Sequence, residues 1–176
     1  MTRLNIKKNV LAALFLALGM VLPLLTSQIK EIGDSLLPMH LTVLLCGVIC
    51  GAGYGSAVGL LLPFLRSVSF GMPPIYPNAV WMALELATYG FVIGFLYSRI
   101  KRSGAVKIYV SLITAMIAGR IVWGVTKWLL LGIGGKSFTL AMFVSGGFID
   151  ALPGIIIQLI LIPLIVKIMH KSNPQG

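Results

Sequence analysis

The chain has 176 residues, of which 58% are hydrophobic and only 10% are charged, and its formal net charge is +10. A soluble globular domain carries about 25% charged residues, so this composition excludes a soluble domain. The positive charges lie between long apolar runs, which indicates membrane topology rather than nucleic acid as a partner. We therefore expect an all-α integral membrane protein whose surroundings are the lipid bilayer.

The apolar runs predict six membrane-spanning helices in a single domain that covers residues 1–176. Helices of roughly 20 residues cross the hydrocarbon core, and we expect the two short segments in the second and third positions to form a hairpin. The first run is interpreted as a retained span, because no Ala-x-Ala-like cleavage site follows it. The predicted spans cover residues 5–26, 38–50, 54–70, 77–99, 106–131 and 138–169.

The basic residues predict the orientation of the chain. With six crossings, one side of the membrane receives Arg3, Lys7, Lys8, Arg99, Lys101, Arg102, Lys107, Lys167 and Lys171. Lysine and arginine accumulate on the cytoplasmic side of membrane proteins. Both termini are therefore expected inside the cell, whereas an odd number of spans would divide these charges between the two faces.

Several ionisable residues remain inside the predicted spans. They are Arg66, Glu85, Arg120, Lys127 and Asp150. A helical rise of about 1.5 Å per residue places them at mid-depth or in the outer half of the membrane. A lone charge at the bilayer centre costs about 3 kcal/mol, so these residues form either a substrate site or structural ion pairs between helices. If all are ionised, one positive charge is in excess, and a substrate carboxylate would neutralise it.

Two predicted helix faces each place a tryptophan between two polar residues at i, i+3, i+7 spacing. These sets are Asn78, Trp81 and Glu85, and Arg120, Trp123 and Lys127. Tryptophan supplies stacking area and an N–H donor, but each tryptophan alone is equally compatible with the interfacial aromatic belt. His40 lies where the outer loop meets the second span, and it can bind substrate or cap the helix next to water.

The sequence carries no catalytic or nucleotide-binding motif. Gly134–Ser137 is similar to the end of a P-loop, but Leu130 stands where the first glycine is required and no strand precedes it. Cys46 and Cys50 have no nearby histidine or cysteine partners, which makes a weak case for a metal site. We expect a non-enzyme without a metal or cofactor of its own, so that any ATPase driving transport is another polypeptide.

In the order of its segments, the chain resembles the substrate-binding S components of energy-coupling factor (ECF) transporters, six-helix proteins of the bacterial and archaeal plasma membrane. The resemblance covers nearly the whole chain. It rests on the basic start leading to Ala12–Leu18, on Leu37–His40 opening a short span, on the Gly51–Gly55 turn, and on Asp150 with Pro153-Gly154 in the sixth span. S components capture a vitamin or a metal at the outer face, and they dock onto a membrane coupling subunit and two cytoplasmic ATPases.

The resemblance also implies roles for particular residues. Family members commonly dock through small residues at four-residue spacing on the first helix, which implies Ala13 and Ala17 here. The family's pocket draws on the first outer loop and on helices four to six. Together with the residue pattern, this gives an expected substrate-binding set of His40, Arg66, Asn78, Trp81, Glu85, Arg120, Trp123, Lys127 and Asp150.

Two functional hypotheses follow. The first is an S component that binds a vitamin-like organic molecule, because the metal-type N-terminal histidine is absent. The excess positive charge favours pantothenate, with riboflavin, pyridoxine or a queuosine precursor as alternatives. The second is a stand-alone proton-coupled carrier of a small organic solute that uses Glu85 or Asp150 as a proton relay, although the internal repeat of many carriers is not visible.

Overall fold

The protein is described by a computed structural model that covers residues 3–26, 36–101, 104–135 and 137–172. Most of the predicted outer loop at 27–37 lies outside the described residues. The same holds for Arg102, for Lys136 in the P-loop-like segment, and for the side chains of residues 3–4 and 170–172. The predicted contributions of these residues to charge and orientation therefore stay predictions.

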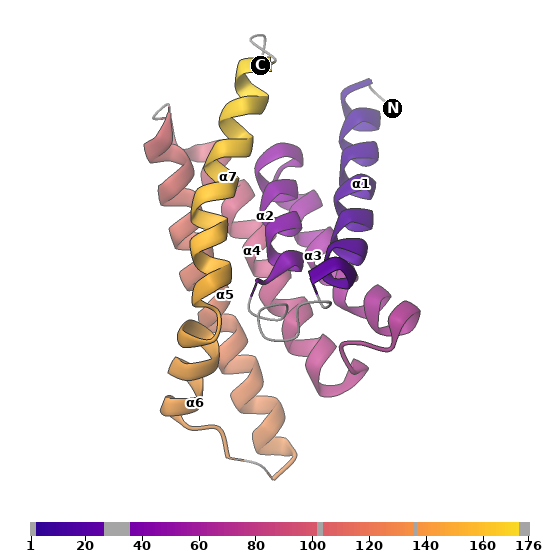
Figure 1. Cartoon of the computed structure of the whole chain (residues 1–176), viewed down its shortest axis with the longest axis vertical. Coiled ribbons are helices and arrows are strands. Elements are labelled where there is room, and N and C mark those ends of the chain that lie inside the picture. Colours follow the sequence, from indigo (N-terminus) through magenta and orange to yellow (C-terminus); the bar gives the residue numbers. More distant parts are fainter. Residues whose placement is uncertain (1–2, 27–35, 102–103, 136, 173–176) are drawn as a thin grey trace.

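The described residues form helices joined by short connections, without a strand. The elements are α1 (Arg3–Thr26), α2 (Pro38–Cys50), α3 (Ala52–Phe70), η1 (Ile75–Ala79), α4 (Val80–Arg99), α5 (Ala105–Ile133), α6 (Leu140–Val144), η2 (Ser145–Ile149) and α7 (Leu152–Ser172). Figure 1 shows both termini at one end of the bundle and α6 at the opposite end. Four segments are long and apolar enough to cross a membrane: Asn5–Thr26, Ile75–Arg99, Ala105–Ile133 and Leu152–Met169.

The predicted sixth span is the segment that differs most from the structure. A continuous helix was expected over 138–169, but α6 and η2 end at Ile149 and α7 starts only at Leu152. Pro153 has no N–H group and cannot continue the hydrogen-bond ladder, although proline is well tolerated in the first turn of a new helix. Before the break, the Asp150 N–H bonds to the Ser145 carbonyl in the wider π-helical pattern.

Glycines bring the backbones of α2, α3 and α4 into direct contact. A Cβ atom added to Gly59 would collide with the Leu86 carbonyl, and one added to Gly90 would collide with the backbone of Gly55. A Cβ on Gly47 would lie 2.6 Å from the Gly90 carbonyl oxygen. Small residues allow such close helix approach in membranes. We call this contact, made by Gly47, Gly55, Gly59 and Gly90, the glycine seam.

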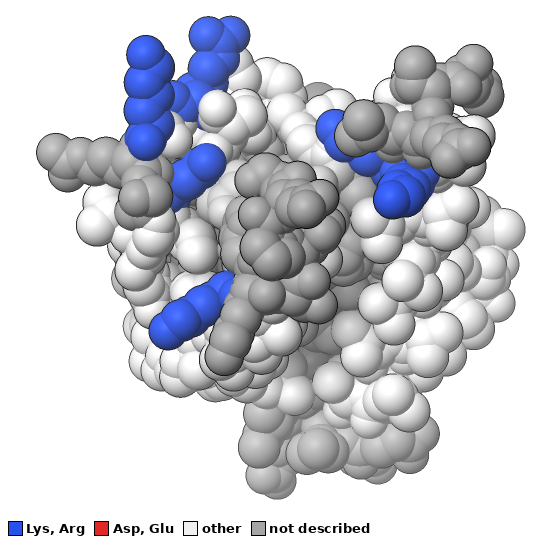
Figure 2. All heavy atoms as spheres, turned by 90° about the horizontal axis from the view of Figure 1, so that it is seen from above, with Lys and Arg blue, Asp and Glu red and all other residues white. Residues whose placement is uncertain are grey.

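Charge is distributed unevenly between the two ends of the bundle. Figure 2 shows the face that carries the termini, where lysine and arginine side chains gather and no acidic side chain is visible. The described basic residues at this end are Lys7, Lys8, Arg99, Lys101, Lys107 and Lys167. The acidic residues within the described ranges, Glu85 and Asp150, lie nearer the other ends of their segments.

Candidate functional site

A buried ionic contact joins α2, α4 and α5. Nη1 of Arg120 on α5 donates a hydrogen bond of 2.9 Å to Oε1 of Glu85 on α4. Nε2 of His40 on α2 lies 3.3 Å from the same oxygen, outside hydrogen-bond geometry. Glu85, His40 and Arg120 are only 1%, 3% and 4% exposed. We call these three residues the charge cluster; it brings together residues predicted separately on three spans.

Arg120 retains hydrogen-bonding capacity beyond its contact with Glu85. Its Nε and Nη2 atoms are buried, and they have no hydrogen-bond partner among the described residues. A buried donor left without an acceptor costs about 1–3 kcal/mol, and more when the group is charged. The planar guanidinium fork matches a carboxylate with two parallel hydrogen bonds. The charge cluster can therefore accept an oxygen-rich group, and a carboxylate fits it best.

Lys127 lies one turn beyond Trp123 and two turns beyond Arg120 on α5, and aromatic rings surround it. Its Nζ is 4.6 Å from the ring centroid of Trp123, 5.2 Å from that of Trp81 and 5.5 Å from that of Phe138. We call these three residues the aromatic cage. Each ring face attracts the ammonium electrostatically. The Trp123 ring also lies 5.9 Å from the guanidinium carbon of Arg120, so this residue connects the cage to the charge cluster.

The other predicted site residues take different positions. Arg66 is buried, but its Nη1 donates a 2.7 Å hydrogen bond to the Met20 carbonyl of α1, and its guanidinium faces the Phe70 ring. Arg66 is thus held by contacts other than the charge cluster. Asn78 is half-buried in η1, and Asp150 is exposed at the end of η2.

Three aromatic residues at the site were not predicted from the sequence. The Tyr89 ring packs edge-on against the His40 ring, with 5.1 Å between the ring centroids. Tyr89 follows Glu85 by four residues, and this spacing places both residues on one helix face, so it could have indicated the position of Tyr89. Phe138 completes the aromatic cage, and Phe143 lies 6.0 Å from Trp123. No pattern in the sequence distinguishes these two phenylalanines from aromatic side chains that face lipid.

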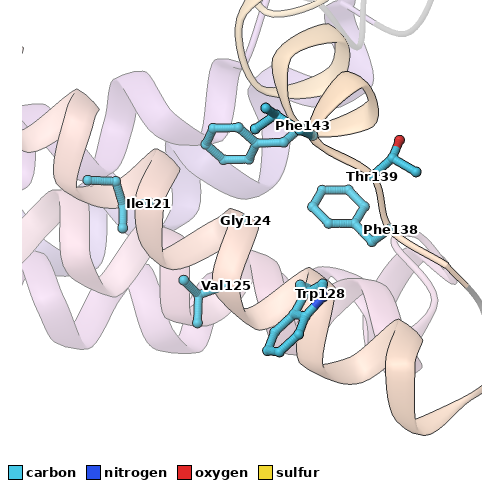
Figure 3. Close-up of a pocket in the computed structure, with 8 residues that line it drawn as sticks. Ile121, Gly124, Val125, Trp128, Phe138, Thr139 and Phe143 are labelled. Atoms are coloured by element: carbon cyan, nitrogen blue, oxygen red, sulfur yellow. The ribbon is translucent and has the colours of Figure 1, made fainter.

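An apolar cavity of about 300 Å³ lies between α5 and the segment that leads into α6. Figure 3 shows Phe138 and Phe143 on one side of it, and Ile121, Val125 and Trp128 of α5 on the other. Its remaining lining residues are Gly124, Thr139 and Leu140. Among the described residues, its lining contains no charged side chain, so this cavity suits an apolar group and is distinct from the charge cluster.

A comparison with protein families matches residues 7–166 to the family "ECF transporter, substrate-specific component". The chain belongs to this family. The resemblance seen in the sequence is thereby confirmed. No significant match was found among curated proteins or among solved structures.

As an S component, the protein is a substrate-specific membrane subunit of an ECF transporter. Such subunits bind their substrate and do not catalyse a reaction. Membership implies association with the ECF module, which consists of the coupling subunit and ATPases, and a place in a prokaryotic cell membrane. The family and the apolar helices together support an all-helical membrane protein.

Proposed function

We propose that this S component captures a small water-soluble vitamin or precursor that carries a carboxylate, and that it does so from outside the cell. The supporting observation is a pair of buried donors on Arg120 that have no partner among the described residues, close to a second cation in the aromatic cage. Glu85 forms a salt bridge with only one of these two cations, Arg120. Lys127 is half-buried and has no salt-bridge partner among the described residues, although the charge of Asp150 also acts on it. A substrate carboxylate would be attracted by both cations.

Pantothenate is the first candidate, because it combines a carboxylate with hydroxyl and amide groups and a branched apolar segment. In this proposal Arg120 and Lys127 hold the carboxylate, and Trp81 and Trp123 pack against the apolar part. Riboflavin, pyridoxine and a queuosine precursor are the alternatives, and they lack that combination.

The remaining predicted residues have secondary parts in the proposal. Glu85 and Asp150 would accept hydrogen bonds from ligand hydroxyls. His40 and Asn78 would complete the rim of the site. Arg66 belongs to the proposed set less directly, because the Met20 carbonyl already holds its guanidinium.

The proposed topology has six spans in one domain, residues 1–176, with both termini in the cytoplasm. It is supported by the basic face in Figure 2, because basic residues mark the cytoplasmic side. The short α2 would pair with α3 as a hairpin held by the glycine seam. In this orientation the aromatic cage and α6 lie at the outer end, where substrate would arrive.

The proposed docking face for the coupling subunit lies on α1. Ala13 and Ala17 are exposed there, whereas Ala12 and Phe15 point into the bundle and are buried. Two exposed small residues at four-residue spacing permit close approach of another helix. Two cytoplasmic ATPases bound to the coupling subunit would supply the energy for import.

The substrate assignment is tested by measuring binding of a vitamin panel to the purified protein by calorimetry. We expect nanomolar pantothenate binding, and at least about tenfold weaker binding for Arg120→Lys, because lysine cannot make the bidentate contact. Arg99→Lys is the matched control, because Arg99 lies at the end of α4 that is remote from Glu85. This variant should bind pantothenate as the wild type does. Nanomolar riboflavin binding with no pantothenate binding would overturn the assignment.

The competing carrier hypothesis is tested separately in proteoliposomes that contain this chain alone. A proton gradient should produce no uptake of the bound vitamin unless the coupling subunit and ATPases are added with ATP. Uptake driven by the proton gradient alone would favour the stand-alone carrier.

A further inference from the structure

A second, larger cavity lies at the opposite end of the molecule from the aromatic cage. It has a volume of about 710 Å³, within the size range of about 300–1,000 Å³ for small-molecule sites. It is enclosed by the end of α4, the start of α5 and the second half of α7. We call it the basal groove, and its lining residues are Tyr97, Gly104, Ala105, Lys107, Ile108, Tyr109, Ile160, Pro163, Leu164 and Lys167.

The basal groove exists because α7 packs only loosely against α5. Contacts between α4 and α5 are extensive, whereas those between α5 and α7 are few. Ile108 forms a buried floor, while Ile160 and Leu164 on α7 remain largely exposed. The groove therefore has apolar walls that open toward the hydrocarbon of a membrane.

Two lysines at the basal groove give it a positive charge. Nζ of Lys107 lies 4.3 Å from the ring centroid of Tyr97, and Lys167 is exposed on α7. Glu85 precedes the end of α4 at Arg99 by fourteen residues, about 21 Å along a helix. Asp150 precedes Lys167 by seventeen residues, most of which belong to α7. Within the described residues, no carboxylate is therefore placed to neutralise the two lysines.

We propose that the basal groove binds an anionic phospholipid of the cytoplasmic leaflet. Its phosphate would lie between Lys107 and Lys167, and its acyl chains would follow the apolar wall formed by Ile160 and Leu164. Basic pockets between membrane helices on the cytoplasmic side attract anionic head groups, at about 1 kcal/mol per basic residue. The proposal uses the orientation proposed above and does not depend on the substrate.

A protein occupant fits the basal groove less well. Small residues favour close helix packing in membranes, but the exposed side chains at this wall are bulky: Tyr109, Ile160 and Leu164. A second copy of this chain in a two-fold arrangement would bring its own lysines toward these two. A phospholipid supplies both the negative charge and the flexible apolar chains.

The proposal is tested by native mass spectrometry of the purified, substrate-free protein, titrated with phosphatidylglycerol or with phosphatidylcholine of the same acyl chains. We expect preferential retention of phosphatidylglycerol, and at least about tenfold weaker retention for the double variant Lys107→Gln/Lys167→Gln. The variant Lys107→Arg/Lys167→Arg keeps the charge and should retain the lipid. Lys7→Gln/Lys8→Gln removes the same charge from α1 on the same face and should bind within twofold of the wild type.

Three outcomes would overturn the proposal. The first is equal retention of the two lipids, and the second is an equal loss in the α1 control, which would indicate general surface electrostatics. The third concerns Leu164→Trp, which fills the basal groove. If this variant abolishes assembly with the coupling subunit and leaves lipid retention unchanged, the groove is a protein interface. If the wild-type protein does not bind pantothenate, the proposed substrate is refuted, but the lipid-retention results are unaffected because they are measured without substrate.

Discussion

Removing one partner of the Glu85–Arg120 pair should destabilise the protein more than removing both. Glu85→Leu leaves a guanidinium that is 4% exposed without its anion, and breaking a buried pair in this way costs about 3–5 kcal/mol of unfolding free energy. Arg120→Met leaves the Glu85 carboxylate, which is only 1% exposed, without its cation, and it should cost a similar amount. The double variant replaces the pair by apolar side chains and should recover most of the stability.

The assay is a double-mutant cycle on unfolding free energies, measured by circular dichroism in mixed detergent micelles. We expect the sum of the two single-variant losses of unfolding free energy to exceed the loss in the double variant by at least about 2 kcal/mol. Glu85→Leu combined with Lys167→Met is the control, because the two residues lie far apart and their effects should add within about 0.5 kcal/mol. A coupling energy below about 0.5 kcal/mol for Glu85 and Arg120 would refute the buried pair.

Three further predictions concern packing, ligand charge and docking. Gly59→Ala should lower the unfolding free energy by about 1–3 kcal/mol because its Cβ meets the Leu86 carbonyl, whereas Gly53→Ala on the same helix meets open space and should cost nothing. Lys127→Met should weaken carboxylate ligands about tenfold, or 1.4 kcal/mol, and calorimetry with a neutral analogue should show no change. Ala17→Trp should reduce co-purification with the coupling subunit and leave substrate binding intact. Ile117→Trp, at a position on α5 that is also exposed, should assemble normally. Unchanged assembly of Ala17→Trp would contradict the α1 docking face.

The extent of α2 and the depth of polar residues along their helices were features that the sequence could predict. The segment predicted over 38–50 coincides with α2, because Pro38 marks its start and Gly51, with a φ of 102°, can adopt the backbone conformation required at its end. Depth along each helix placed Glu85 and Arg120 in one layer, and the structure brings these two side chains into contact. The grouping required only the helical rise per residue and the alternating direction of the spans.

The rotation of each helix about its own axis was not predictable from the sequence. Arg66 has the depth of a site residue, yet it turns toward the Met20 carbonyl of α1. The spacing of Lys127 with Trp123 indicated one helix face, but the contribution of Phe138 depends on how the chain returns after α5. The break after Ile149 was missed because glycine is common in membrane helices, and Gly146-Gly147 therefore did not indicate a helix end.

The glycine seam limits which parts of the molecule can move when a ligand binds. Helices whose backbones touch cannot slide without a clash, so α2, α3 and α4 should move as one rigid body. The side chains of His40 and Glu85 belong to that body, while Arg120 reaches it from α5. A ligand that competes with Glu85 for the guanidinium would therefore move the Arg120 side chain, while the backbones of α2, α3 and α4 stay in place.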